Sequence, residues 1–113
     1  LDVDVLPRTT SGNSADISAT AAGNAASNPY TAGLPDDMQQ ALARRYAELF
    51  DVFLKHRKAI GRITFWGVTD GDSWLNNFPT RGRTNYPLLF DRQGKPKPAF
   101  DAAVSKAKAA IRI

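Results

Sequence analysis

The chain has no cysteine among its 113 residues, which excludes disulfide scaffolds, thiol nucleophiles and cysteine-based zinc sites. It also lacks an apolar run near the ~18 residues that a membrane-spanning helix needs. No secretion signal is expected, because the first residues already alternate between apolar and acidic side chains. The net charge is only +4, and nucleic-acid binding usually needs a clustered basic face. The composition predicts one small globular domain.

Two short segments are predicted to form strands. Residues 1–6 alternate between apolar and acidic side chains, a pattern typical of a strand with one apolar face. Residues 62–68 are rich in β-branched and aromatic side chains, which predicts a second, largely buried strand. Because side chains alternate along a strand, we expect Ile63 and Phe65 to face one way and Trp66 the other.

Two helices are predicted from apolar residues at helical spacing. The first follows Pro35, with Asp36 or Asp37 as its N-terminal cap, and is expected to stop near Gly61 after a basic last turn. The second is expected to run from about Ala99. Its apolar stripe consists of Phe100, Ala103, Val104, Ala107 and Ile111.

A long connection follows each predicted strand. Residues 7–35 are expected to form a long loop with potential mobility, and residues 69–98 form another. In a (β/α)8 barrel the loops after the strands carry the active site, whereas the loops before them only turn the chain. The order strand, loop, helix, strand, loop, helix therefore predicts an α/β fold. Because a whole barrel needs roughly 250 residues, residues 1–113 are expected to be one partial domain, about a quarter of a barrel.

Both tryptophans, Trp66 and Trp74, lie in or beside the loop that follows the second predicted strand. An indole ring offers a large flat face that suits the C–H faces of a sugar ring, and nearby polar side chains suit its hydroxyl groups. These polar residues are Asp70, Asp72, Ser73, Asn76 and Asn77. The sequence therefore favours a carbohydrate-binding surface. The alternative is that Trp66 is a core residue of a buried strand.

Four aspartates allow more than one interpretation. Asp70 and Asp72 could bind calcium, but the other ligands of a calcium loop are absent from the sequence, which favours capping of the loop backbone. Asp2 and Asp4 stand in a predicted strand that leads to a barrel loop. They are candidates for acid–base catalysis or for binding backbone amides.

The basic residues favour structural or solvated roles. His56, the only histidine, lies in a basic helix end without an evident carboxylate partner, and we interpret it as solvated. The run at residues 55–62 lacks interleaved aromatic side chains and is expected to be a solvated surface. Arg81 and Arg83 are expected to hold the long loop by ion pairs, since no phosphate-binding glycine pattern precedes a helix.

Several strings resemble glycoside hydrolase family 10, the endo-β-1,4-xylanases. Residues 63–77, with the sequence Ile-Thr-Phe-Trp-Gly-Val-Thr-Asp-Gly-Asp-Ser-Trp-Leu-Asn-Asn, resemble the eighth-strand segment of that family. Residues 81–91 and 95–100 are similar to the segments that follow it. Residues 1–7 resemble the stretch that leaves the seventh strand, whereas the loop at 8–35 has no clear counterpart in this resemblance.

The resemblance implies a (β/α)8 barrel that hydrolyses xylan with retention by means of two glutamates. The family's nucleophile stands immediately before the pair matched by Leu1 and Asp2, so both catalytic glutamates are expected upstream of residue 1. Glu48, the only glutamate of the chain, lies mid-helix and is not matched to either. Trp66 and Trp74 would line the glycone side of the cleft. Asp2 would support the nucleophile without touching the sugar.

The implied parent is an endo-1,4-β-xylanase, and the chain alone is expected to be inactive. Its partners would be xylan or xylooligosaccharides and the preceding part of the barrel, with no cofactor, metal, nucleic acid or membrane. Family members are typically exported, which implies a secreted or cell-surface location. Leu75 stands where some relatives carry arginine, and the 7–35 loop, which binds calcium in some relatives, offers Asp16. A non-catalytic carbohydrate-binding module that uses Trp66 and Trp74 is the alternative.

Overall fold

The computed structural model describes residues 1–7, 21–22, 28–78 and 80–110, so most of the predicted 7–35 loop lies outside the described residues. The described elements follow one another as β1 (Ala21–Ala22), α1 (Asp36–Lys55), the 3-10 helices η1 (Asp70–Asp72) and η2 (Trp74–Asn76), β2 (Thr80–Arg81) and α2 (Pro98–Ala110). Neither α1 nor α2 is long and apolar enough to cross a membrane.

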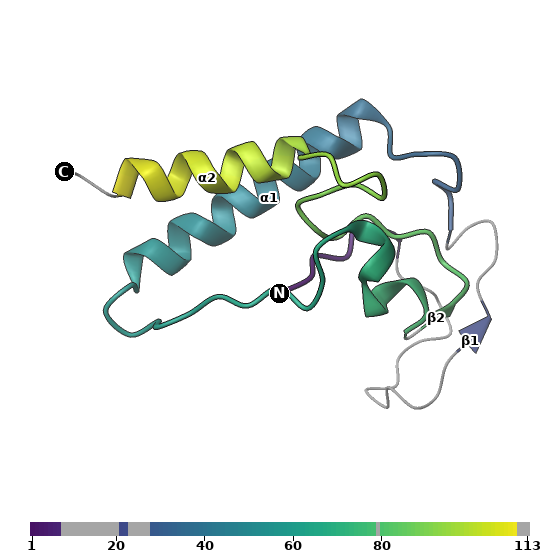
Figure 1. Cartoon of the computed structure of the whole chain (residues 1–113), viewed down its shortest axis with the longest axis horizontal. Coiled ribbons are helices and arrows are strands. Elements are labelled where there is room, and N and C mark those ends of the chain that lie inside the picture. The colour runs from purple at the N-terminus through teal and green to yellow at the C-terminus, as the bar shows by residue number, and fades with distance from the viewer. Residues whose placement is uncertain (8–20, 23–27, 79, 111–113) are drawn as a thin grey trace.

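The two α-helices are the two that the sequence predicts, and they form one layer. α1 and α2 lie side by side and run in the same direction (Figure 1). α1 buries Leu42, Ala43 and Tyr46, and α2 buries Ala99 and Ala103. Alanine side chains at the contact allow the helix backbones to approach closely, while the larger residues of α1 fill the remaining space.

The start of α1 differs from the prediction. The helix begins at Asp36 with Pro35 in the N-cap position and without a side-chain cap, so the predicted capping by Asp36 or Asp37 is wrong. Asp37 instead accepts a hydrogen bond from the backbone N–H of Met38 at 2.9 Å. Both carboxylates still lie in the first turn, where they favour the positive end of the helix dipole.

The end of α1 also differs from the prediction. The helix ends at Lys55, earlier than the expected stop at Gly61. Its apolar stripe ends with Leu54, and the exposed polar run 55–58 that follows has no side chain to bury against the core. In α2 the predicted start is confirmed to within one residue, whereas Ile111 lies outside the described residues.

Neither predicted strand forms a hydrogen-bonded ladder. The segment 62–68 runs extended beside the N-terminal segment (Figure 1). The ammonium group of Leu1 donates to the carbonyl of Thr64, but the N–H of Val3 donates to the carbonyl of Pro87 at 3.3 Å. Because the N-terminal segment divides its hydrogen bonds between two neighbours, it builds a continuous ladder with neither.

The ladder found among the described residues lies in segments that the sequence predicts as loops. β1 pairs with β2 in parallel, with Ala21 opposite Thr80 and Ala22 opposite Arg81. The pair joins the first long connection to the second. The prediction of loops is therefore wrong at these four positions, since a two-residue strand is too short to show the alternation that identifies strands in a sequence.

The alternation predicted for residues 62–68 is confirmed, but the predicted burial is not. Ile63 and Phe65 are half-buried, whereas Trp66 and Val68 are 74% and 66% exposed. The helix layer and its core cover only one face of this segment. The expectation of a largely buried strand is therefore wrong for the other face, which carries the first tryptophan.

The core lies between the helix layer and the extended segments. Leu42, Tyr46 and Ala99 form its fully buried centre. The ring of Tyr46 stacks on that of Phe65 with centroids 6.1 Å apart, and its hydroxyl donates to the carbonyl of Pro87. The half-buried residues that pack against this centre are Leu1, Val3, Val5, Phe50, Phe65 and Leu89.

Candidate functional site

Three aromatic rings form an exposed cluster, which we call the aromatic patch: Trp66, Trp74 and Phe78. The centroids of the two indoles lie 6.4 Å apart with planes inclined at 55°, and Trp74 lies 6.5 Å from Phe78. Trp74 and Phe78 are 38% and 41% exposed. The interpretation of Trp66 as a core residue is therefore wrong. Phe78 was not predicted to belong to this surface. Its position four residues after Trp74, about one helical turn, was a signal for it.

Two successive caps shape the loop that carries the second tryptophan. The N–H and hydroxyl of Thr69 donate to the Asp72 carboxylate at 3.1 and 3.2 Å, and the N–H of Asp72 donates to the Thr69 carbonyl at 2.9 Å. These bonds hold the pKa of Asp72 below its usual value. Ser73 Oγ then accepts from the N–H of Leu75 at 3.2 Å, which starts η2 at Trp74. The predicted capping role of Asp72 is confirmed.

The two N-terminal aspartates make different contacts. Asp2 accepts a hydrogen bond from Ser73 Oγ at 2.6 Å, so its carboxylate is tied to the loop that carries the second tryptophan. Asp4 accepts from the N–H of Leu6 at 3.0 Å and from Asn85 Nδ2 at 2.8 Å. The interpretation of Asp4 as a group that binds a backbone amide is confirmed.

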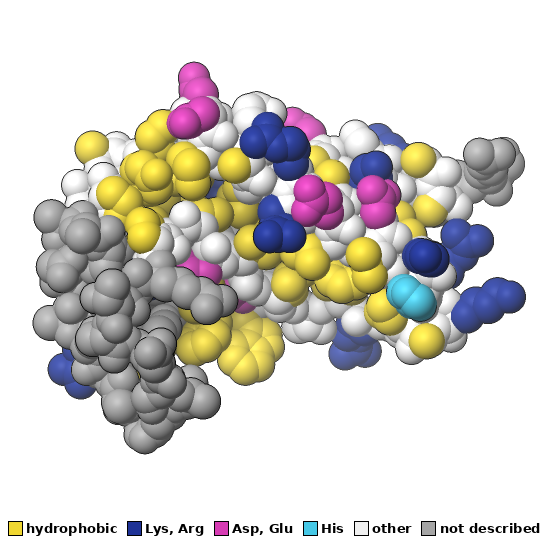
Figure 2. Space-filling model, turned by 180° about the vertical axis from the view of Figure 1, so that it is seen from behind, with side chains coloured by type: hydrophobic (Ala, Val, Ile, Leu, Met, Phe, Trp, Pro, Cys, Tyr) yellow, Lys and Arg dark blue, Asp and Glu magenta, His cyan; other side chains and the backbone are white. Residues whose placement is uncertain are grey.

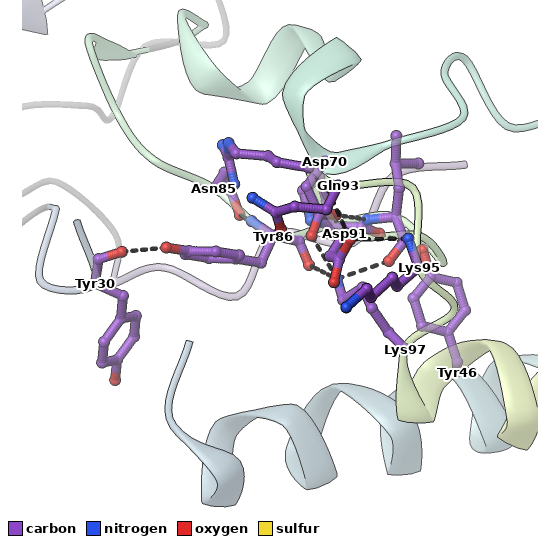
Figure 3. Close-up of polar contacts among 12 residues, drawn as sticks. Tyr30, Tyr46, Asp70, Asn85, Tyr86, Asp91, Gln93, Lys95 and Lys97 are labelled. Carbon is purple, nitrogen blue, oxygen red and sulfur yellow. Dashed lines mark hydrogen bonds and ion pairs between the residues drawn. The ribbon is translucent and has the colours of Figure 1, made fainter. Parts of the chain in front are cut away.

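A buried ion pair holds the segment between the two tryptophans, and the sequence did not reveal it. Lys97, just before α2, places Nζ 2.9 Å from Asp70 Oδ2 and 3.1 Å from Oδ1. The same ammonium group donates to the carbonyls of Tyr86 and Leu88 at 2.8 and 2.7 Å. Figure 3 shows these groups converging between the loops and the helix layer. Asp70 also accepts a hydrogen bond from the backbone N–H of Leu88 at 2.8 Å, so its predicted role in binding loop backbone is confirmed. The ion pair with Lys97 is a second structural role that the sequence did not predict.

Burial disfavours the charged form of both partners in this pair. It raises the pKa of Asp70 and lowers the pKa of Lys97, while their mutual attraction opposes both shifts. Burial also raises the pKa of Tyr46, and the carboxylates of Asp2 and Asp70 raise it further. Tyr46 therefore stays a neutral hydroxyl that donates a hydrogen bond in the core.

Asn76 connects the loop of the aromatic patch to the next segment. Its Nδ2 donates to the carbonyl of Asp70 at 2.9 Å. Its Oδ1 accepts from the N–H of Asn85 at 2.8 Å and from Arg92 Nη2 at 3.0 Å. The Arg92 guanidinium also lies 5.0 Å above the ring centroid of Tyr86, an attractive cation–π arrangement.

His56 and Arg83 occupy the places that the sequence favours. Figure 2 shows His56 exposed among lysine and arginine side chains at one end of the molecule. Arg83 is buried, donates to the Pro7 carbonyl at 2.7 Å and lies 3.6 Å from an oxygen of Asp4. Its predicted role in holding the loop is confirmed. Arg81 lies exposed in β2, and nothing tests the ion pair predicted for it.

The chain's only glutamate and its metal-binding potential complete the description of the site. Glu48 is exposed in the middle of α1 and pairs with Arg45 at 3.3 Å. Residues 1–7, 28–78 and 80–110 hold no group of three or more His, Asp or Glu side chains that could bind a metal. A polar hollow of about 410 Å³ lies between the turn at 31–34 and residues 91–93.

Comparison with known proteins places this chain in a family. The model of glycosyl hydrolase family 10 matches residues 11–106. This match includes most of the loop at 8–35, for which the resemblance in the sequence offered no counterpart. The endo-1,4-beta-xylanase A of Xylanibacter ruminicola is 45% identical over 98 residues, which cover 87% of this chain and 27% of that protein. The endo-1,4-beta-xylanase of Geobacillus stearothermophilus is 48% identical over 65 residues, covering 58% and 20%.

A solved structure agrees with these relatives. The endoxylanase of the same family retrieved from a sugarcane soil metagenome superimposes with a TM-score of 0.85 at 48% identity, covering 93% of this chain and 30% of that chain. The chain thus spans less than a third of the length of these relatives, and the matches lie in their C-terminal part. Its fold class is α/β, part of a (β/α)8 barrel. The chain belongs to glycosyl hydrolase family 10.

Proposed function

We propose that the chain is the C-terminal part of an endo-1,4-β-xylanase that hydrolyses internal β-1,4-xylosidic bonds of xylan with retention. The observation that carries this proposal is the exposed pair of indoles, Trp66 and Trp74, held beside a polar loop. The xylanase names of the relatives that match this chain support the substrate class.

The indoles bind sugar by stacking. A xylose ring presents C–H groups on its faces and hydroxyl groups around its rim, so an indole covers a face while polar side chains bind the rim. Because the planes of Trp66 and Trp74 are inclined at 55°, they suit two neighbouring sugars or two sides of one sugar. Each indole face that the sugar covers contributes roughly 25 cal/mol to the binding free energy per Å² of apolar area removed from water.

The reacting carboxyl groups come from polypeptide that precedes Leu1. A retaining glycosidase needs two carboxyl groups about 5–5.5 Å apart: one protonates the leaving oxygen and the other attacks the anomeric carbon. Glu48 does not serve, since it lies exposed on α1. Asp2 supports the nucleophile indirectly, because its carboxylate already accepts the Ser73 hydroxyl.

The missing partner of this chain is the rest of the barrel. The strands of a parallel sheet are covered on both faces, yet one face of the segment 62–68 is exposed. An apolar groove of about 170 Å³ lies along this segment. Its lining residues are Phe65, Gly67, Val68, Leu89 and Phe90. The parent enzyme is exported or held at the cell surface, where its polymeric substrate is accessible.

The activity is tested by measuring reducing sugars released from xylan. The full-length protein that carries this chain is expected to release them, whereas the 113-residue chain is not. In the full-length protein, Trp74→Ala is expected to raise KM for xylooligosaccharides about tenfold, because stacked area is lost. Val52→Ala, which truncates an exposed side chain on α1, is the control and is expected to leave KM unchanged.

Three results would contradict this proposal. Hydrolysis by the 113-residue chain alone would place the reacting acids inside it. Unchanged KM and kcat in Trp74→Ala would remove the aromatic patch from the substrate cleft. Cooperative unfolding and sugar binding by the isolated chain, with no hydrolysis by the full-length protein, would favour the carbohydrate-binding module.

A further inference from the structure

Asp70 stands midway between the two indoles in the sequence, four residues after Trp66 and four before Trp74. Its side chain is fully buried, whereas Trp66 and Trp74 are exposed. Lys97 meets it from the turn before α2. One buried contact therefore holds the middle of the segment that connects the two rings.

The contacts of Lys97 join three segments of the chain. Its ammonium group has three N–H donors, and these reach the carboxylate of Asp70 and the carbonyls of Tyr86 and Leu88. Asp70 Oδ1 accepts in return from the N–H of Leu88 at 2.8 Å. The donors of the lysine are therefore all used, and each fixes a different part of the backbone.

Backbone hydrogen bonds extend the same frame. The N–H of Asp70 donates to the carbonyl of Phe90, and the N–H of Lys97 donates to the carbonyl of Leu89, both at 2.9 Å. A Cβ placed on Gly67 would lie 3.0 Å from Asp72 Cβ and 3.1 Å from Leu88 Cδ1, so the residue after Trp66 packs directly against this frame. These contacts connect the segments that carry both indoles to one buried ion pair.

A buried ion pair is poorly suited to stability alone. The cost of removing two charges from water is often as large as their attraction, and apolar residues of similar volume can stabilise a fold equally well. What the charges add is direction, because an ammonium group that binds a carboxylate and two carbonyls fixes all three in space. This geometry suits a site in which two rings must keep a set distance.

We propose that Asp70 and Lys97 are positioning residues that hold Trp66 and Trp74 at the separation and inclination needed to bind the sugar chain. The inference rests on the proposed function, in which these indoles bind xylan. Neither Asp70 nor Lys97 touches the sugar. They act through the loop at residues 69–76 and through the segment that passes Leu88.

The test uses the full-length protein and the substitution Lys97→Met, which keeps an unbranched side chain only one atom shorter and removes its charge. A merely structural role would reduce the folded fraction, which lowers kcat at constant KM. Mispositioned indoles instead raise KM for xylooligosaccharides, here by about tenfold, with a smaller change in kcat. Lys106→Met is the matched control, because it removes an exposed ion pair between α1 and α2, and KM is expected to stay within twofold.

NMR spectroscopy gives a second readout, which reports directly on the surroundings of the two indole rings. The indole N–H resonances of Trp66 and Trp74 are assigned by Trp→Phe substitution at each position. Lys97→Met is expected to shift both resonances, and Lys106→Met neither. If the unsubstituted protein hydrolyses no xylan, the proposed function fails, whereas the resonances still test whether the buried pair positions the rings.

The double variant Asp70→Asn with Lys97→Met guards against misfolding of the single variant, since it leaves no unpaired buried charge. The same rise in KM and the same shifts are expected from it. Unchanged KM and unchanged indole resonances in a folded variant would overturn the inference. Loss of folding in both variants would also overturn it, because the pair would then serve global stability.

Discussion

Two aspartate–lysine pairs of similar length lie in different regions of this molecule. Asp51 and Lys106 join α1 to α2 across 3.1 Å, with side chains 58% and 39% exposed. Asp70 and Lys97 join the loop region across 2.9 Å, with side chains 0% and 2% exposed. The chemical groups are the same, and only their surroundings differ.

The comparison shows that the surroundings decide what an ion pair does. Water screens the helix pair and solvates either partner when the other moves away, so such pairs contribute about 0–1 kcal/mol. The loop pair has no water to replace a lost partner. Its lysine depends on the carboxylate and two backbone carbonyls, so removal of one charge leaves the other stranded in the protein interior.

Breaking each pair in turn is expected to give the largest contrast. Lys97→Met is expected to lower the free energy of unfolding by about 3–5 kcal/mol, because it leaves Asp70 buried without its partner. Lys106→Met is expected to lower it by less than about 1 kcal/mol. Denaturant unfolding of the full-length protein measures both. Equal losses in the two variants would refute the distinction between the regions.

A side chain added at Gly67 is expected to have an intermediate effect on the free energy of unfolding. A Cβ at Gly67 would meet Asp72 and Leu88 at 3.0 and 3.1 Å, whereas a Cβ at Gly71 would meet its nearest neighbours at 3.6 Å. Gly67→Ala is therefore expected to cost about 1–3 kcal/mol of unfolding free energy through overpacking. Gly71→Ala, four residues further along the chain, serves as the control with little expected loss. A thermal melt of each variant provides the comparison, and a stable Gly67→Ala protein would show that the packing relaxes easily.

The pH dependence of the loop is expected to give the smallest effect. Hydrogen bonds from Thr69 lower the pKa of Asp72 below 3.8. A lowered folded-state pKa contributes stability above the unfolded value, and this contribution is lost as the pH falls through the lowered value. The Asp72→Asn variant has no carboxyl group to titrate at this position. Its free energy of unfolding is therefore expected to be lower than that of the unsubstituted protein at neutral pH, and this difference is expected to vanish in strong acid. A deficit that is the same at neutral and strongly acidic pH would contradict this assignment.

The helices could be predicted from the sequence, whereas the strands could not be predicted in full. Helical hydrogen bonds form within one segment, so the apolar spacing that includes Leu42 and Tyr46 was enough to identify α1. A strand needs a neighbour in register. The face that Phe65 turns inward was predictable, but the N-terminal segment divides its hydrogen bonds between Thr64 and Pro87.

The candidate site shows the same division. Trp66 and Trp74 were predictable as a surface feature, because tryptophans beside a glycine-containing polar loop suit sugar binding. Lys97 was not predictable as a buried residue. It lies between Pro96 and Pro98 after another lysine, Lys95, and lysines in such a segment are almost always exposed.

The sequence by itself determined the two helices, the alternating faces of the second extended segment and the family resemblance of the loop with both tryptophans. These features are local, since they depend on residue types at short spacing. The tertiary structure alone decided which charges are buried and which polar groups meet. Asp70 and Lys97 are 27 residues apart, and only the folded chain excludes the water that would otherwise separate and screen their charges.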